Sequence, residues 1–254
     1  MKIVRFSANG KIKYGILKGQ YIQAITGKPF NSIKYSGEQY KNSEVKLLAP
    51  CQPSKIVALG VNYVNHGVEL NHPVPESPLI FIKPATAVIG PEDNIIYPPS
   101  SQQVDYEAEM GVVIRKVTRR IKKENALDYV LGYVCFNDVT ARDQQKADGQ
   151  WTRAKSYDTF APLGPCIETE LDPKNVNVES YLNGKLKQQG NTSDLVFPVT
   201  ELIHFISNVM TLLPGDVIAT GTPSGIGPMQ PGDTIEIKIP PIGTLKNYVS
   251  RQND

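Results

Sequence analysis

The sequence predicts an α+β fold that is mostly β, with a small N-terminal β domain over residues 1–48 and a larger domain over residues 49–254. Three observations favour this fold. The length of 254 residues suits one large domain, alone or with a small appendage. The 20 glycines and 20 prolines are spread along the chain, which favours many short elements over long helices. Short apolar runs are numerous, whereas few stretches have the period of an amphipathic helix.

The first 48 residues have the pattern of a small β unit. Asn9-Gly10 is a turn signal between two apolar runs. The polar stretch from Lys34 to Lys46 predicts a connector, and Ala49-Pro50 and Gln52-Pro53 mark the domain boundary. The predicted strands of this unit are Ile3 to Phe6, Tyr14 to Leu17 and Tyr21 to Ala24.

The larger domain is predicted to contain mostly strands and three helices. The clearest helix runs from Pro198 to Leu213, because Pro198 suits the first helical position and apolar residues form a stripe behind it. Asn183-Gly184 predicts a hairpin within Val178 to Lys187. The other predicted helices are Lys123 to Leu131 and Asn65 to Leu70, the latter a short helix or only a turn; further strands are Ile56 to Leu59 and Thr234 to Ile239.

The composition argues against several classes of protein. Hydrophobic residues make up 40% and charged residues 20% of the chain, near the globular average. No apolar run is long enough for a membrane helix, and the N-terminus lacks the apolar core of a signal peptide, so we expect a cytoplasmic protein with no membrane partner. With a net charge of +2 we expect no nucleic-acid partner, and the basic run between Arg115 and Lys123 predicts a solvated connection. The three cysteines are expected to be free thiols.

An acidic strand from Val104 to Arg115 is the most informative segment. In a strand, Asp105, Glu107 and Glu109 project from the same face. Three carboxylates on one face repel one another unless a cation lies among them, the alternative being a solvated edge of a sheet. Mg²⁺ prefers oxygen ligands, and Asp138, at the end of the next apolar run, could supply a third carboxylate.

Six sequence blocks, in this order, closely resemble the fumarylacetoacetate hydrolase family across roughly residues 50–250. The blocks are GVNYVNHGVEL (residues 60–70), DYEAEM (105–110), NDVTARDQQ (137–145), AKSYDTFAPLGP (154–165), ATGTPSGIG (219–227) and IGTLKN (242–247). The resemblance implies a mixed β-roll for the catalytic domain and metal ligands at Glu107, Glu109 and Asp138. Asp105 is then expected to hold the end of the strand or to contact one of the residues that bind the metal, and not to bind the metal itself.

The resemblance also implies the chemistry. A divalent ion (Mg²⁺ or Mn²⁺, with Ca²⁺ possible) would act on a small-molecule 2-oxo acid or 1,3-dicarbonyl substrate. The main expectation is hydrolysis of a carbon–carbon bond in an acylpyruvate. Decarboxylation of oxaloacetate and isomerisation of a hydroxymuconate-type acid are the alternatives, because all three reactions share an enolate. Family members are commonly homodimers, which we also expect here.

His66 and Glu69 are the predicted base pair. Three residues apart on a helical turn, their side chains share a face, and a carboxylate beside an imidazole orients it and raises its basicity. His66 would then deprotonate a water molecule, although an isolated histidine is more often structural. A lid over Asn65 to Pro78 is a further expectation by analogy with the family, and His72 and His204 are expected to be structural.

Four more residues match the family's active-site blocks. Lys155 would offset the excess carboxylate charge or stabilise a developing enolate. Arg142 and Gln145 would contact the substrate, since a guanidinium can bind a carboxylate through two nitrogens. Thr222 would hydrogen-bond the substrate carboxylate, with a turn-forming role beside Pro223 as the alternative. A metal-binding scaffold without activity is disfavoured, because His66, Glu69 and Lys155 occur together.

Overall fold

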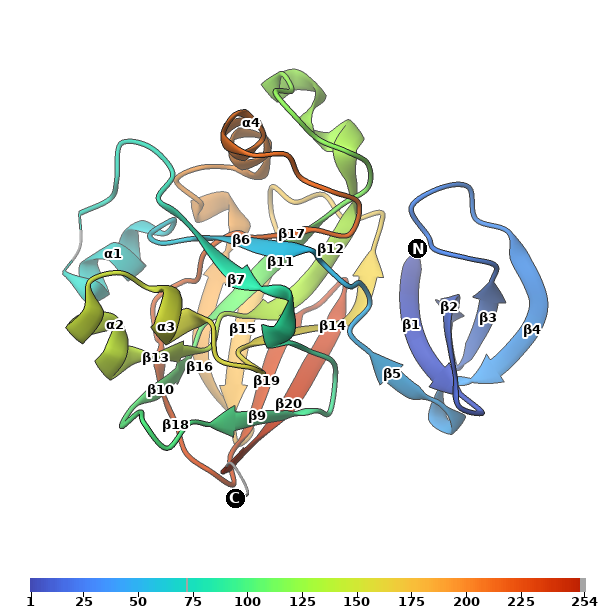
Figure 1. Ribbon diagram of the computed structural model, residues 1–254, viewed down its shortest axis with the longest axis horizontal. Helices are drawn as coiled ribbons and strands as arrows, with labels where there is room; N and C mark the ends of the chain where they lie inside the picture. The colour runs from blue at the N-terminus through green and yellow to red at the C-terminus, as the bar shows by residue number, and fades with distance from the viewer. Residues whose placement is uncertain (72, 252–254) are drawn as a thin grey trace.

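The computed structural model describes residues 1–71 and 73–251, and strands dominate it (Figure 1). The largest sheet has the strand order β4-β3-β2-β1-β14-β12-β11-β17-β6-β7, with β5 beside β1 and β8 beside β14. Its strands are β1 (Lys2–Ala8), β2 (Lys11–Lys18), β3 (Tyr21–Ile25), β4 (Tyr35–Lys41), β5 (Lys46–Leu48), β6 (Lys55–Leu59), β7 (Ile80–Pro84), β8 (Val88–Ile89), β11 (Ala108–Ile114), β12 (Val130–Asn137), β14 (Ala161–Glu168) and β17 (Val217–Ala219).

Two smaller sheets and four α-helices complete the described fold. A five-stranded sheet is ordered β16-β15-β19-β20-β9, and a three-stranded sheet is ordered β13-β10-β18. Their strands are β9 (Asn94–Tyr97), β10 (Val104–Tyr106), β13 (Thr140–Ala141), β15 (Asn177–Leu182), β16 (Lys185–Asn191), β18 (Gly227–Met229), β19 (Thr234–Ile239) and β20 (Gly243–Arg251). The helices are α1 (Val64–Leu70), α2 (Arg142–Asp148), α3 (Thr152–Lys155) and α4 (Val199–Val209), with short 3₁₀ helices at Asn42–Glu44, Ala85–Ala87, Lys123–Tyr129 and Thr192–Asp194.

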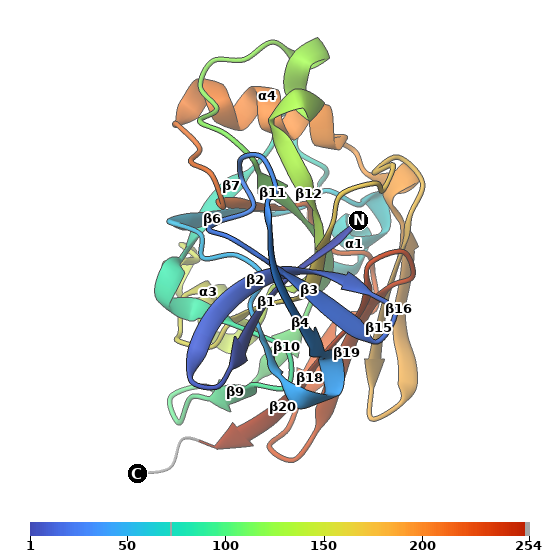
Figure 2. The same cartoon turned by 90° about the vertical axis from the view of Figure 1, so that its right-hand side faces the viewer.

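The main core lies where the large sheet packs on the five-stranded sheet. Val112 of β11 and Cys135 of β12 belong to the same buried cluster as Ile237 of β19 and Leu245 of β20. In the view turned by 90°, β15, β16, β19 and β20 lie together below and to the right of β11 and β12 (Figure 2). The alternating isoleucines of β19 supply one side of this core, so the mostly β, α+β prediction is confirmed. None of the described helices has the length and hydropathy that crossing a membrane requires.

The N-terminal strands β1 to β4 form a lobe at one side of the molecule, drawn in blue (Figure 1). The lobe continues the large sheet, because β1 pairs with β14 through Lys2–Glu168 and Ile3–Ile167. The amino group of Met1 lies 2.6 Å from Glu168 Oε1 and strengthens this junction. The division into two domains at residue 48 stays a prediction.

Several predicted elements are present with close to the expected bounds. The strand Ile56 to Leu59 lies within β6, and Thr234 to Ile239 coincides with β19. The Asn183-Gly184 turn joins β15 to β16, with φ values of 51° and 74° that suit a type I′ hairpin. The short helix option for Asn65 to Leu70 is confirmed as α1.

Two predicted elements were wrong, in both cases because the segment buries few side chains. The expected connector Lys34 to Lys46 contains the strand β4, which pairs with β3 at the edge of the sheet and is almost wholly exposed, so it lacks apolar alternation. The expected helix Lys123 to Leu131 is a 3₁₀ helix that ends at Tyr129, after which the chain enters β12. Ala126 is its only buried residue, too little for an amphipathic α-helix.

The longest predicted helix is shorter than expected. α4 begins at Val199, with Pro198 as its N-cap, and ends at Val209 instead of Leu213. Met210 is extended, and Leu212 forms a β-bridge with Thr118. The apolar residues after Val209 therefore belong to an extended, strand-like segment. The helical spacing of apolar residues alone cannot distinguish such a segment from one more turn of helix.

Candidate active site and metal centre

The acidic segment is two strands, not the single strand that the sequence predicts. β10 ends at Tyr106 and pairs with β13 and β18, whereas β11 begins at Ala108 and pairs with β12 and β17. Glu107 lies at the break. Its carbonyl accepts from Asp138 N at 2.9 Å, and its N–H donates to Asn137 Oδ1 at 3.0 Å. The end of β12 is thereby fixed beside Glu107.

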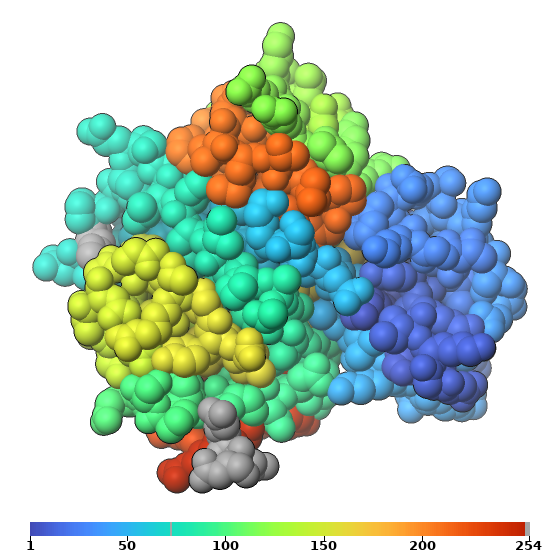
Figure 3. All heavy atoms as spheres, in the orientation of Figure 1, coloured from blue at the N-terminus to red at the C-terminus, as the bar shows by residue number. Residues whose placement is uncertain are grey.

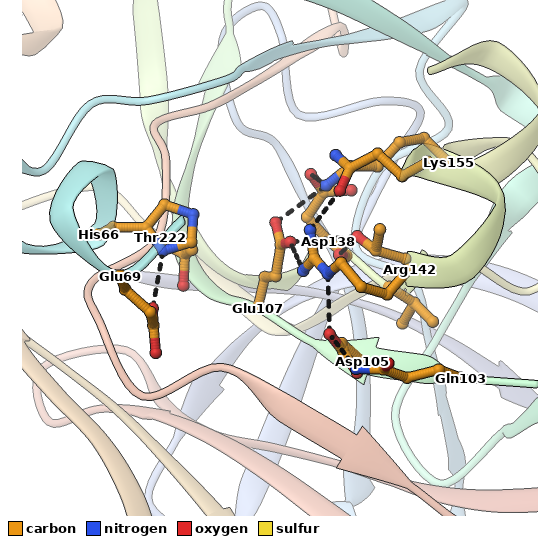
Figure 4. Close-up of polar contacts among 12 residues, drawn as sticks. His66, Glu69, Gln103, Asp105, Glu107, Asp138, Arg142, Lys155 and Thr222 are labelled. Atoms are coloured by element: carbon orange, nitrogen blue, oxygen red, sulfur yellow. Dashed lines mark hydrogen bonds and ion pairs between the residues drawn. The ribbon is translucent and has the colours of Figure 1, made fainter. Parts of the chain in front are cut away.

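The three predicted metal ligands converge at this junction. One oxygen from each of Glu107, Glu109 and Asp138 lies within 4.8 Å of the others, and all three side chains are buried. The side chain of Lys155 reaches toward Glu107 and Asp138 (Figure 4), and Lys83 contacts Asp138 as well. Lys155 Nζ is 2.9 Å from Glu107 Oε2 and 2.6 Å from Asp138 Oδ2, and Lys83 Nζ is 2.5 Å from Asp138 Oδ1.

Arg142 links the fourth carboxylate, Asp105, to this cluster. Its Nε donates to Asp105 Oδ2 at 2.8 Å, and its two terminal nitrogens donate to Glu107 Oε1 and Gln145 Oε1. Asp105 is thus paired with a guanidinium group and does not belong to the three-carboxylate group. This agrees with the expectation from the sequence that Asp105 is not a metal ligand. Each terminal nitrogen of Arg142 keeps a second N–H for another acceptor.

The carboxylates differ in their electrostatic surroundings. Burial alone would raise the pKa of Glu107, but Lys155 and Arg142 hold it far below its usual value. Burial raises the pKa of Glu109 well above its usual value, and the negative charges of Asp138 and Glu107 add to that shift. Glu109 is therefore the carboxylate whose charge is least compensated by the protein.

The hydrogen bonds of Glu109 test whether the site fits a cation. Its Oε2 accepts from Gly221 N at 2.8 Å, while Oε1 is buried and has no hydrogen-bond partner among the described residues. An orphaned buried carboxylate oxygen that faces two further carboxylates is poorly satisfied by protein alone. The donor set is all oxygen, which suits Mg²⁺, Mn²⁺ or Ca²⁺. The acidic triad therefore fits a divalent metal ion.

His66 and Glu69 lie on α1 as the sequence predicts. His66 is buried, and its Nδ1 lies 3.0 Å from Glu69 Oε2. Glu69 Oε1 accepts from Gly225 N at 2.9 Å, which fixes the carboxylate between helix and loop. Because a carboxylate only accepts, Nδ1 carries a proton in this contact, and Nε2 of the neutral imidazole then presents a lone pair.

A cavity of about 530 Å³ joins the two groups. His66, Glu107, Arg142, Gln145 and Lys155 line it together with an apolar wall that comprises Val61, Leu70, Pro73, Pro75, Leu79 and Trp151. The yellow α2–α3 segment packs against the teal residues around β7 on this face of the molecule (Figure 3). A small organic acid fits a cavity of this size and lining.

The remaining predicted residues have structural contacts. The hydroxyl of Thr222 donates to Ala108 O and accepts from Gln188 Nε2, both at 2.8 Å, so it holds the start of β11. These bonds favour the structural alternative, and a contact between Thr222 and substrate stays a prediction. His204 lies 2.7 Å from Ile121 O through Nδ1. His72 lies outside the described residues.

Sequence reasoning missed Lys83. This lysine on β7 is fully buried, and its ammonium group also donates to Val139 O at 3.1 Å. The available signal was a lysine inside the apolar run Ile80–Pro84, because a buried lysine nearly always has an ionic partner. The identity of that partner, 55 residues away, has no local signature.

Comparisons with known proteins agree on one family. Residues 55–250 match the family described as "Fumarylacetoacetate (FAA) hydrolase C-terminal", and residues 1–50 match "Rv2993c-like, N-terminal". The chain is 44% identical over 220 residues to the mitochondrial oxaloacetate tautomerase FAHD2B of Bos taurus, covering 82% of this chain and 70% of the relative.

Two solved structures are similar over nearly the whole chain. The 5-carboxymethyl-2-hydroxymuconate delta-isomerase from Mycobacterium smegmatis superposes with a TM-score of 0.94 at 41% identity, covering 99% of this chain and 100% of that one. The maleylpyruvate hydrolase from Sphingobium sp. SYK-6, in complex with manganese (II) ion and pyruvate, gives a TM-score of 0.83 at 31% identity, with 100% of both chains covered. The similar proteins thus include isomerases and tautomerases as well as hydrolases.

Proposed function

Because the chain belongs to the fumarylacetoacetate hydrolase family, we propose that it is a metal-dependent hydrolase that cleaves a carbon–carbon bond in an acylpyruvate or related 2-oxo acid. One observation carries the proposal. His66, which is paired with Glu69, and Glu107, which belongs to the acidic triad, line a single cavity large enough for such an acid. A base and a metal site on the same cavity are what addition of water to a 1,3-dicarbonyl compound requires.

Glu107, Glu109 and Asp138 would hold the ion, with Mg²⁺ or Mn²⁺ favoured and Ca²⁺ an option. The manganese ion named with the Sphingobium hydrolase supports this choice. When bound, the ion would act as a Lewis acid on the keto oxygen of the substrate. Arg142 and Gln145 would bind the substrate carboxylate through the hydrogen-bonding groups they turn toward the cavity.

The protein's own groups perform the proton transfers. His66 Nε2 would take a proton from water, and the hydroxide would add to the acyl carbonyl carbon. The bond between that carbon and the pyruvate fragment then breaks, which gives a carboxylic acid and, after proton return, pyruvate. Lys155 would stabilise the negative charge that develops on the pyruvate fragment. Glu69 keeps the imidazole oriented and stabilises its protonated form.

A second candidate is an isomerase or tautomerase on the same site. The Mycobacterium smegmatis isomerase and the Bos taurus tautomerase, both above 40% identity, favour it. Both reactions move a proton next to a carbonyl group and need no activated water. A decarboxylase acting on oxaloacetate would use the metal site with neither activated water nor the base.

A substrate panel with Mg²⁺ tests the proposal. The panel comprises acetylpyruvate, fumarylpyruvate, oxaloacetate and a hydroxymuconate, followed by ultraviolet absorbance and by enzymatic assay of pyruvate. Release of pyruvate and a carboxylic acid from an acylpyruvate, lost in His66→Ala, is the expected result. Loss of the enol absorbance without any bond cleavage would identify the isomerase, and release of carbon dioxide from oxaloacetate the decarboxylase. We also propose that the protein is a homodimer. None of these assays depends on its oligomeric state.

A further inference from the structure

Three lysine or arginine residues line the cavity, and two of them are paired with the carboxylates of the site. Lys155 is paired with Glu107 and Asp138, and Arg142 with Asp105 and Glu107. Lys146 is different. Among residues 1–71 and 73–251, no carboxylate oxygen lies within 4.0 Å of its ammonium group. Lys146 is exposed and lies where the cavity opens to solvent.

The position of Lys146 relative to Arg142 is set by α2. The two residues are four apart on this helix, so their side chains lie on one face, one above the other. A rise of 1.5 Å per residue separates their backbones by about 6 Å along the helix axis. Arg142 contacts Glu107 of the acidic triad, and Lys146, one helical turn further along α2, lines the same cavity.

Much of the cavity wall is apolar. Leu70, Leu79 and Trp151 line it, and the indole of Trp151 is held by an edge contact with Phe81 at 5.3 Å between ring centroids. This wall suits the carbon chain of a ligand and offers no partner to a charge placed in its middle.

We propose that Lys146 is a specificity-determining residue that binds a second carboxylate at the far end of the substrate. This inference rests on the proposed function, which places the 2-oxo acid group at the triad. The preferred substrates are then diacids whose two carboxylates are separated by an apolar segment longer than that of oxaloacetate. Monoacids with an apolar end still enter the cavity, but they lack the ion pair with Lys146.

Two stable six-carbon acids separate this ion pair from every other contact. Both 2-oxoadipate and 2-oxohexanoate carry the 2-oxo acid group, and only the former has a second carboxylate. Their dissociation constants are measured by calorimetry with Mg²⁺ present. We expect 2-oxoadipate to bind about five-fold more tightly to the wild type, in the range of a partly exposed ion pair. We expect that ratio to fall as salt is added.

Three variants complete the experiment. Lys146→Met keeps the apolar stem and should reduce the ratio to about one without changing the affinity for 2-oxohexanoate. Lys146→Arg should retain the preference, as should Lys174→Met at an exposed site away from the cavity. With an acylpyruvate that has a distal carboxylate, Lys146→Met should raise KM and leave kcat nearly unchanged.

The outcomes distinguish the two proposals. Equal binding of both acids to the wild type, or a preference that survives in Lys146→Met, would overturn the role of Lys146 and leave the 2-oxo acid function in place. Failure of both acids to bind would overturn the proposed function itself, and the role of Lys146 with it.

Discussion

Burial and the neighbouring negative charges both raise the pKa of Glu109. The side chain is fully buried, Glu107 and Asp138 lie close by, and the two lysines of the cluster contact the other two carboxylates. Among the described residues, the N–H of Gly221 is the one hydrogen-bond donor to Glu109, and the charge of Lys155 adds a smaller compensation. A divalent ion would remove this imbalance, so Glu109 is the best residue at which to test the metal site.

We therefore expect Glu109→Gln to lose the binding of Mg²⁺ and Mn²⁺. In calorimetric titrations the affinity should fall by more than about 100-fold, in line with the loss of one charged ligand. The variant should also lose the rise in Tm that metal gives the wild type, while its metal-free Tm should not be lower, because a buried uncompensated charge has been removed. Asp105→Asn is the matched control and should keep most of the affinity. Unchanged Mn²⁺ binding in Glu109→Gln would show that the ion is held elsewhere.

The second prediction at this scale concerns His66. His66→Ala should lower kcat by about 10² to 10⁴, the usual contribution of a positioned base. Its metal affinity should match the wild type, because His66 contacts Glu69 and not the acidic triad. Glu69→Gln should cost less than His66→Ala because the imidazole remains, although the single oxygen of Gln can accept from Gly225 N or from His66 Nδ1 but not from both.

Steady-state kinetics and metal titration on the same preparations check this. If His66→Ala weakened metal binding as much as Glu109→Gln does, His66 would be a ligand and Lys155 the next candidate base. If kcat were unchanged, the hydrolytic mechanism would have no base, and a decarboxylase would become the better interpretation.

Among the elements, β6 leads directly to the loop and helix that carry His66, and Asp216 fixes its beginning. The carboxylate of this fully buried residue accepts from Ser54 N and Ser54 Oγ at 2.9 and 2.7 Å and from Lys55 Nζ at 2.5 Å. It also accepts from Leu213 N at 2.8 Å, just before β17, which runs parallel to β6. The Asp216 side chain thus fixes the beginning of β6 relative to the beginning of β17.

Asp216→Asn should lower the free energy of unfolding by about 3 kcal/mol at pH 7, because it leaves Lys55 and buried N–H groups without their charged acceptor. Burial would raise the pKa of Asp216, but the hydrogen bonds from Lys55, Leu213 and Ser54 lower it overall. A lowered folded-state pKa gives stability that is complete above the unfolded-state value of about 3.9 and is lost as the pH falls through the folded-state value. Urea unfolding should show a constant difference between wild type and variant from about pH 7 to 5 that shrinks below about pH 4. A difference that grew on acidification would contradict this account.

The end of β6 also shapes the cavity through Gly60. A methyl group at Gly60 would lie 2.9 Å from both Leu79 Cδ2 and a ring carbon of Trp151, so Gly60→Ala must displace the indole. Trp151 is the only tryptophan in the sequence, and its fluorescence reports that displacement directly. We expect a shifted emission maximum and a several-fold higher KM, with metal affinity unchanged. Gly10→Ala, at a turn with open space around it, should leave both emission and KM as in the wild type.

The sequence predicts an element well when the residues of that element alone determine its structure, and poorly when contacts with distant residues determine it. β19 alternates because one face is buried along its whole length, and the hairpin at Asn183-Gly184 needs only a backbone that accepts positive φ. β4 buries almost nothing, so no periodicity records that it pairs with β3. The end of α4 is set by a bridge to Thr118, a contact outside any sequence window.

The same distinction holds for the site. Glu107 and Glu109 are recognisable from their spacing, since carboxylates are unusual in a buried strand. The ion pairs of Asp105 with Arg142 and of Asp138 with Lys83 join residues 37 and 55 positions apart, and no local pattern predicts either pairing.

At the scale of the whole molecule, the exposed apolar residues indicate where two copies of the chain could associate. Among the described residues β7 is the last strand of this end of the large sheet, and it carries Ile82, 45% exposed, shortly after Leu79, 47% exposed. Val64 and Val68 of α1 are exposed as well. Apolar side chains on an unpaired strand edge favour association, and a second copy of the chain would cover them.

We expect a homodimer that depends on this edge. Light scattering during size-exclusion chromatography at micromolar concentration should give about twice the chain mass of 28.0 kDa. Ile82→Lys places a charge on the edge and should shift the mass toward that of a single chain, because burying an unpaired ammonium group opposes association. Ile12→Lys, at a 58% exposed position on β2 in the N-terminal lobe, is the matched control and should remain dimeric. A single-chain mass for the wild type would contradict the homodimer itself. A dimer that persisted in Ile82→Lys and dissociated in Ile12→Lys would instead place the contact on the N-terminal lobe, leaving the edge of β7 exposed beside the cavity.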